Sequence, residues 1–171
     1  MRFFRNKKQP LIIAEISGNH GGSFEKAKAL ILESAKAGAD YVKLQTFKPE
    51  TVTVEGMDSR FKIQSGLWKG YRLHDLYAKA MTPWEWHKPL SKYALELGIS
   101  LFSSPFDESA VRFLEEEINP SVYKVASFEL NHFPLLKKIG ETRKPVIASR
   151  GVSSDDSCLL YTSDAADDVV G

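Results

Sequence analysis

The chain has 171 residues, of which 43% are hydrophobic and 26% charged, values that are ordinary for a soluble globular domain. Its formal net charge of +1 gives no electrostatic basis for binding nucleic acid or an anionic membrane, so we expect neither partner. No segment reaches the roughly 18 consecutive apolar residues of a membrane span. The single cysteine, Cys158, has no partner for an internal disulfide, which is typical of the reducing cytoplasm, and we expect a cytoplasmic protein.

Short apolar runs alternate with helical stretches along the chain, which predicts βα units around a parallel sheet. Residues 11–16 form a continuous, largely β-branched run that predicts a strand buried on both faces. Ser23 is suited to cap the following helix, and Gly38 to end it in the left-handed conformation. Residues 40–44 are the second predicted strand, and a long excursion rich in threonine, glycine and charge follows over residues 47–71.

The alternation then resumes. Further helices are expected at residues 73–80, from about 83 to 98, 108–117 and 133–140, and further strands at 99–102, 122–126 and 145–148. The last three strands recur at intervals of about 23 residues, which suits the repeated units of a (β/α)₈ barrel. A doubly wound sheet gives similar local patterns, so the spacing leaves both architectures open.

The alternation stops at about residue 153. Residues 158–168, with the sequence CLLYTSDAADD, resemble a translated sequencing adapter and have neither a helical nor a strand period. We therefore expect residues 1–152 to form the folded part of the chain and residues 153–171 to be a non-native or disordered tail. A natural, poorly ordered tail is the alternative.

Polar side chains stand at or just beyond the carboxyl end of every predicted strand. They are Glu15 at the first strand, Lys43 and Gln45 at the second, Ser103 and Ser104 after the third, Lys124, Ser127 and Glu129 around the fourth, and Ser149 and Arg150 at the fifth. In (β/α)₈ barrels this rim is where active sites are built. The two lysines and several hydroxyls suit a ligand that carries a phosphate and a carboxylate. The two glutamates can bind a polyhydroxylated partner or water, or move protons.

Each of these residues has a structural alternative. Lys43 can form an ion pair with Glu15 inside a barrel, and Ser103 and Ser104 can be turn formers that end a strand. Together they predict a ligand site, because burying so many polar groups on one rim without a ligand costs free energy.

The four histidines have no spacing that indicates a metal site. His20 lies in the first strand–helix loop and is a candidate substrate contact, with packing as the alternative. His87, at helical spacing from Trp84, is expected to pack or cap. Trp84 and Trp86 are expected in the core rather than as a platform for a sugar.

Several motifs occur in a characteristic order. They are IAEISGNHGGS at residues 13–23, VKLQT at 42–46, FSSPF at 102–106 and YKVASFE at 123–129. Over roughly residues 10–152 the chain resembles the sialic acid synthase family. The segments LW at 67–68, LHDLY at 73–77, TPWEWH at 82–87 and SFE at 127–129 are similar to its pseudaminic acid synthase branch.

The resemblance implies an α/β fold, an incomplete (β/α)₈ TIM barrel of about the first five βα units. It implies the condensation of phosphoenolpyruvate with an open-chain N-acetylated amino-sugar, 2,4-diacetamido-2,4,6-trideoxy-altrose, to give pseudaminic acid and phosphate. The phosphoenolpyruvate contacts fall on Lys43, Gln45, Ser104, Lys124, Ser127 and Ser149, the pocket wall on Phe106, and the catalytic carboxylates on Glu15 and Glu129.

The family also implies a divalent metal, Mn²⁺ or Mg²⁺, that polarises the aldehyde, a small antifreeze-like domain after the barrel, and a domain-swapped homodimer. The metal ligands of the family belong to later strands than residue 152. We therefore expect no metal site in this chain, and a fragment that is inactive by itself. One departure is Ser149-Arg150-Gly151, where the family has Ser-Thr-Gly.

Two other functions remain open. An N-acetylneuraminate or legionaminate synthase of the same family would keep phosphoenolpyruvate and change the acceptor sugar, although the TPWEWH and SFE segments argue against it. A non-catalytic, carbohydrate-binding fragment is the alternative from another class.

Overall fold

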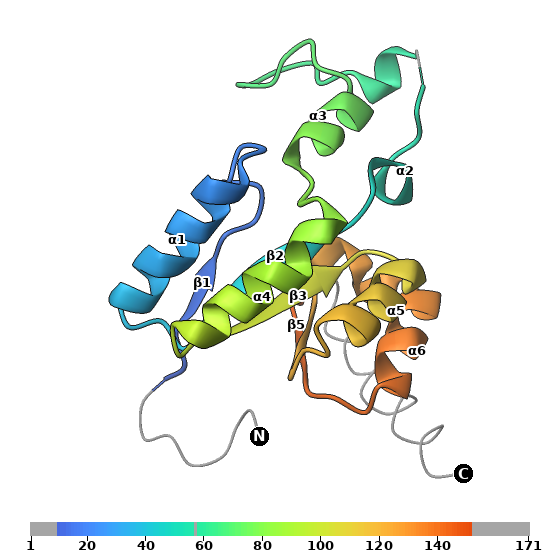
Figure 1. The fold of residues 1–171 in the computed structure, drawn as a ribbon. Helices are drawn as coiled ribbons and strands as arrows, with labels where there is room; N and C mark the ends of the chain where they lie inside the picture. The colour runs from blue at the N-terminus through green and yellow to red at the C-terminus, as the bar shows by residue number, and fades with distance from the viewer. Residues whose placement is uncertain (1–9, 57, 152–171) are drawn as a thin grey trace, which may run out of the picture.

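The computed structural model describes residues 10–56 and 58–151, and five strands form one parallel sheet. In sheet order they are β1 (Ile13–Glu15), β2 (Tyr41–Thr46), β3 (Ser100–Pro105), β4 (Tyr123–Val125) and β5 (Val146–Ala148). Each strand pairs with the next one along the chain, whereas a doubly wound sheet reverses its strand order at a switch point. The sheet curls into half a barrel with helices on its outer face (Figure 1), which confirms the predicted incomplete (β/α)₈ fold.

Helices connect the successive strands and cover the outer face of the sheet. The four connecting helices are α1 (Phe24–Lys36), α4 (His87–Glu96), α5 (Glu108–Glu117) and α6 (Phe133–Glu141). The excursion after β2 contains α2 (Pro49–Val52), η1 (Ser59–Phe61), α3 (Leu73–Ala80) and η2 (Trp84–Trp86), and η3 (Ser127–Asn131) follows β4. In Figure 1 the segment with α2 and α3 projects beyond one end of the sheet. Within the described ranges, no helix is long and apolar enough to span a bilayer.

Local sequence explains where the helices begin and end. The side chain of Ser23 accepts a hydrogen bond from the Lys26 amide at 3.2 Å, as expected of the cap that starts α1. Gly38 follows α1 with a φ of +83°, a conformation that glycine adopts without the steric cost of a side chain. Asp107 caps α5 by accepting from the amides of Ser109 and Ala110.

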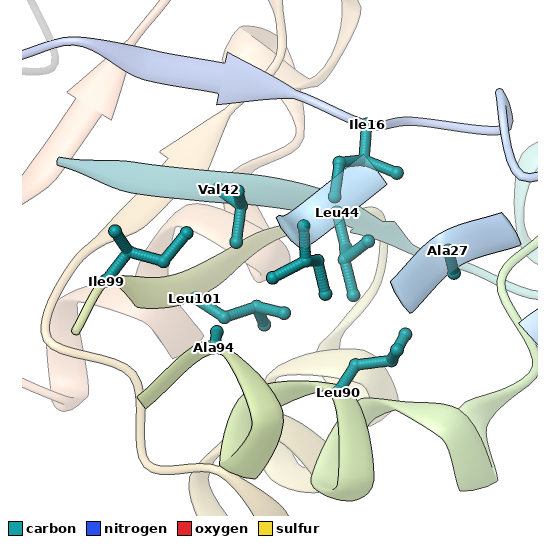
Figure 2. Close-up of a cluster of buried hydrophobic side chains, with 9 residues drawn as sticks. Ile16, Ala27, Val42, Leu44, Leu90, Ala94, Ile99 and Leu101 are labelled. Carbon is teal, nitrogen blue, oxygen red and sulfur yellow. The ribbon is translucent and has the colours of Figure 1, made fainter. Parts of the chain in front are cut away.

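The main core lies between the outer face of β2 and β3 and the helices that cover it. Figure 2 shows Val42, Leu44 and Leu101 facing Leu90 and Ala94 of α4. All five side chains are buried, and each large one contributes about 1.5–3 kcal/mol on transfer from water. A second, smaller apolar group of Tyr41, Phe102 and Val122 lies on the inner face of the half-barrel. β2 and β3 are therefore covered on both faces at their amino ends.

Two expectations about the strands are wrong. The first run was expected to be buried on both faces, but β1 is only three residues long, and Ile12 just before it is 54% exposed. The reason is that β1 is an edge strand, paired only with β2 among the described residues. Ser103 and Ser104 do not follow the third strand but lie inside it, because the pairing with β2 continues to Pro105. The expected tail at residues 153–171, with Cys158, lies outside the described residues.

Candidate functional site

On all five strands, the inner face of the half-barrel changes from apolar to polar towards the carboxyl end. Side chains two residues apart on a strand share a face, so each polar residue stands directly above an apolar one. The pairs are Ile13 and Glu15, Tyr41 and Lys43, Phe102 and Ser104, Val122 and Lys124, and Ile147 and Ser149. Five strands thus contribute to one polar layer above an apolar floor, on the rim where barrels place their sites.

Lys43 is the centre of one half of this layer. Glu15 and Lys43 are direct partners in the register of β1 and β2, and the Lys43 Nζ lies 2.5 Å from the Glu15 Oε2. The same ammonium donates to the Ser104 Oγ at 3.3 Å. Lys43 is only 9% exposed, whereas the carboxylate of Glu15 is open to solvent. The ion pair between Lys43 and Glu15 that was considered from the sequence therefore exists. It lies at the rim, where the Glu15 carboxylate is in contact with solvent, rather than in the buried core.

Lys124 is the centre of the other half. Its Nζ donates to the Ser149 Oγ at 2.5 Å and to the carbonyl oxygen of Val125 at 2.7 Å. Burial, and then the positive charge of Lys43, lower the pKa of Lys124, while Glu15 and Glu129 act in the opposite direction. The two ammonium groups are thus close enough to repel one another. An anion bound between them would relieve this repulsion.

Glu129, in η3 just after β4, has the least satisfied polar atom of the site. Its Oε2 is buried and has no hydrogen-bond partner among the described residues. Burial raises the pKa of Glu129, and its own backbone amide, His132 and Lys124 only partly offset this effect. A buried carboxylate oxygen without a partner costs free energy, and such atoms in native folds call for an explanation such as a bound group.

Backbone conformations on the rim are specialised at two places. Ser17, just beyond β1, has a φ of +47°, uncommon for a residue with a side chain, and its hydroxyl donates to the Glu15 Oε1 at 2.7 Å. Gly151 has a φ of +49°, and a Cβ there would lie 2.0 Å from the Cβ of Ser127. No side chain fits in that space, so the backbone after β5 packs directly against Ser127.

Gln45 and Phe106 complete the set predicted from sequence. Gln45 pairs with Ser104 in the register of β2 and β3 and is half-buried, on the same face as Lys43. Phe106 directly follows β3 and is half-buried, and its ring packs edge-on against Phe47 at 5.4 Å. Seven of the nine predicted site residues therefore lie at or just beyond the carboxyl ends of their strands, and Lys43 and Lys124 lie within β2 and β4.

Ser103, His20 and His87 do not belong to this rim. Ser103 faces the helices, where its Oγ lies 2.7 Å from the Thr46 Oγ1. His20 is fully buried and bonds Thr82 at 3.1 Å, and His87 is fully buried beside Thr46, as a packing role predicts. Thr46 is not among the residues predicted from sequence, although a polar residue on the otherwise apolar outer face of β2 is the pattern that could have revealed it.

The described residues do not make a metal centre. No group of three or more histidine, cysteine, aspartate or glutamate side chains among them could hold an ion. Of the two rim carboxylates, Glu15 is already paired with Lys43, and both lie near Lys124, whose positive charge opposes a cation. The donor set suits an anion better than a divalent metal.

Comparison with known proteins agrees with this geometry. The pseudaminic acid synthase of Campylobacter jejuni serotype O:2 is 39% identical over 171 residues, which is 98% of this chain and 50% of the relative. The pseudaminic acid synthase of Helicobacter pylori is 41% identical over 145 residues, 85% of this chain and 42% of the relative. At 32% identity, the relatives include the N,N'-diacetyllegionaminic acid synthase of Campylobacter jejuni.

A solved structure shares the fold. The N-acetylneuraminic acid synthetase of Leptospira borgpetersenii, solved with citrate, superposes with a TM-score of 0.76 and 27% identity, covering 91% of this chain and 50% of that one. The chain spans about half the length of the curated relatives it matches. The family model described as "NeuB family" matches residues 30–159, three quarters of the chain. The chain belongs to the NeuB family.

Proposed function

We propose that the rim binds phosphoenolpyruvate. A protein that contains this chain and has the full length of the relatives is called the full-length protein below. We propose that it condenses phosphoenolpyruvate with an open-chain N-acetylated amino-sugar. The acceptor we propose is 2,4-diacetamido-2,4,6-trideoxy-altrose, and the products are pseudaminic acid and phosphate. The observation that carries the proposal is the single polar layer, in which Lys43 and Lys124 stand among hydroxyls above an apolar floor.

The chemistry of phosphoenolpyruvate matches this layer. The molecule carries a phosphate and a carboxylate on one carbon, which is joined by a double bond to a small apolar methylene. We assign its anionic groups to Lys43 and Lys124, because charge-assisted hydrogen bonds to oxyanions are the strong ones. The hydroxyls of Ser104, Ser127 and Ser149, together with the amide of Gln45, supply further donors. Phe106 closes one side of the pocket.

The reaction must balance one carbon–carbon bond, one water and one phosphate. The methylene carbon of phosphoenolpyruvate bonds to the aldehyde carbon, water adds to the carbon that bears the phosphate, and the bond from that carbon to the phosphate oxygen breaks. The water keeps one proton as it adds, and that proton leaves with the phosphate when the carbon becomes a ketone. Before that, one proton must reach the aldehyde oxygen, and one must leave the attacking water.

We assign these two protons to the two rim carboxylates. Glu129, whose pKa is raised by burial, is the better donor to the aldehyde oxygen. Glu15, held by Ser17 and Lys43, is the better acceptor from the water. A divalent metal would polarise the aldehyde when bound. The described residues do not fit such a metal, so its ligands would lie outside them.

The choice of sugar rests on the branch of the family. The pseudaminic acid synthases match at 39% and 41% identity and the legionaminic acid synthase at 32%, which supports the acceptor of the former. An N-acetylneuraminate or legionaminate synthase remains the second candidate.

The test is release of inorganic phosphate by the full-length protein, with phosphoenolpyruvate and each of three acceptors. These are the altrose-configured sugar, N-acetylmannosamine and 2,4-diacetamido-2,4,6-trideoxy-mannose, each with and without Mn²⁺. Release with the first sugar alone is expected. Phosphate release with only N-acetylmannosamine or only the mannose-configured sugar would assign the protein to the corresponding branch of the family. No phosphate release with any of the three sugars would contradict the proposal.

A further inference from the structure

A buried chain of hydrogen bonds lies on the outer face of the sheet, directly behind the proposed phosphoenolpyruvate site. The Thr46 Oγ1 is 2.7 Å from the Ser103 Oγ and 2.7 Å from the His87 Nε2. None of the three side chains is exposed to solvent. They join β2, β3 and the first residue of α4 at one point.

The donor and acceptor of each hydrogen bond in this network follow from the tautomer of His87. The His87 Nδ1 lies 3.2 Å and 3.3 Å from the carbonyl oxygens of Trp84 and Pro83, which can only accept, so Nδ1 carries the proton. In the neutral ring the Nε2 is then an acceptor, and the hydroxyl of Thr46 donates to it. Because that hydroxyl has a single proton, its oxygen accepts from Ser103. Each donor in this hydrogen-bond network therefore has at least one acceptor.

The chain is separated from the proposed site by the thickness of the sheet alone. Gln45 precedes Thr46 and Ser104 follows Ser103, and successive side chains on a strand point to opposite faces. Gln45 and Ser104 are themselves direct partners in the register of β2 and β3. The bond between Thr46 and Ser103 thus ties together the backbones that carry both residues.

Packing alone does not require polar groups here. The same outer layer is otherwise built of apolar side chains such as Leu44, Leu90 and Leu101, and burying hydroxyls and an imidazole among them costs free energy until every donor is matched. A buried hydrogen-bond network in which every donor has an acceptor holds its side chains in one arrangement. Apolar contacts are less directional and define side-chain positions less strictly. We infer that Thr46 and His87 are positioning residues that hold Gln45 and Ser104 in place for phosphoenolpyruvate. The inference rests on the proposed function of the rim.

The test separates positioning from stability through Michaelis constants. Thr46→Val replaces the central hydroxyl by a methyl group and leaves His87 and Ser103 unmatched, whereas Thr46→Ser retains the hydroxyl. In the full-length protein, T46V is expected to raise the KM for phosphoenolpyruvate about tenfold, with the KM for the sugar changed less than twofold. T46S should restore the KM for phosphoenolpyruvate. Val111→Ala, a fully buried site on α5, is the matched control that lowers stability and leaves both constants unchanged.

Further readouts keep the outcomes distinct. If T46V does not fold, Ser103→Ala, which removes only the tie between the strands, must raise the KM for phosphoenolpyruvate. Faster hydrogen exchange in the peptides that contain Gln45 and Ser104 is expected in either variant. A folded T46V or S103A with an unchanged KM overturns the inference while the proposed function stands. Absence of phosphoenolpyruvate binding by the unsubstituted protein overturns both.

Discussion

The Nζ of Lys124 lies 2.5 Å from the Oγ of Ser149, which joins the carboxyl ends of β4 and β5 at the proposed site. A second donor of the same ammonium is fixed by the carbonyl of Val125. The third remains to reach an anion, since an ammonium has three donors.

Lys124→Ala should therefore weaken phosphoenolpyruvate binding to the full-length protein by about 1.5–3 kcal/mol, the range for hydrogen bonds to charged groups. This corresponds to a rise in Kd of about 10- to 150-fold, measurable by titration calorimetry. Lys88→Ala is the matched control, because Lys88 is a 70% exposed lysine on α4 that pairs with Glu117 away from the rim. Equal affinity of the K124A and unsubstituted proteins would show that Lys124 is structural.

The affinity for phosphoenolpyruvate should also depend on pH through Lys124. Burial and the charge of Lys43 lower the pKa of Lys124, so the free protein loses this positive charge at a lower pH than an ordinary lysine does. The ammonium form binds the anion, and binding should weaken as pH rises through this lowered pKa. Calorimetric titrations across the alkaline range measure the effect. In K124A this part of the pH dependence should disappear, and its persistence would assign it to another group.

Glu129→Gln tests the proton role of the buried carboxyl. Glutamine fills the same volume and keeps an acceptor, but it cannot deliver a proton, so kcat should fall about 10²- to 10⁴-fold. The Kd for phosphoenolpyruvate should stay within about threefold, because the assigned anion contacts are elsewhere. Glu116→Gln on α5 is the control for loss of a negative charge away from the rim. A kcat close to that of the unsubstituted protein would remove Glu129 from the proton transfer.

Acid should destabilise the fold through His87. Burial lowers the pKa of His87 to about 4 from 6.5, with smaller opposing contributions from the Pro83 and Trp84 carbonyls and Glu85. Between these pH values the unfolded chain binds a proton that the folded one excludes. This contribution to stability is therefore complete above pH 6.5 and is lost as pH falls towards 4, by at most about 3 kcal/mol.

Denaturant unfolding of the full-length protein at pH 7, 5.5 and 4.5 measures this loss. His87→Gln, which lacks the titrating group, is the reference, because the other ionisable residues contribute equally to both proteins. The free energy of unfolding of the unsubstituted protein should approach that of the His87→Gln variant as the pH falls. A constant difference would mean that His87 binds its proton equally in the folded and unfolded states.

We expect the 171-residue chain by itself to have low stability and no catalytic activity. Within the described residues, β1 and β5 each have one unpaired edge, and Phe128 and Phe133 are 79% and 64% exposed. Open parallel edges and solvent-exposed apolar side chains favour association. We expect the isolated chain to aggregate on heating and to release no phosphate. A cooperative, reversible melt together with tight phosphoenolpyruvate binding would contradict this.

Much of the fold could be predicted from local patterns. The cap at Ser23, the left-handed Gly38 and the helices at residues 73–80 and 108–117 follow from contacts within a few residues of the chain. The motifs at the strand ends were sufficient for the family, and in the structure their polar side chains lie along one edge of the sheet. The alternation of side chains along a strand predicts which residues share a face. It does not predict which face lies on the inner side of the half-barrel.

The sequence by itself thus determined the order of strands and helices, the family and the gathering of polar residues on one rim, because these depend on short-range periodicity and local motifs. Only the tertiary structure decided that Ser104 faces the site while Ser103 faces the helices in the chain with Thr46 and His87. It also decided that Glu15 is ion-paired and that one oxygen of Glu129 is buried without a partner among the described residues. These facts depend on pairing between segments distant in the chain, which sets the direction and burial of each side chain.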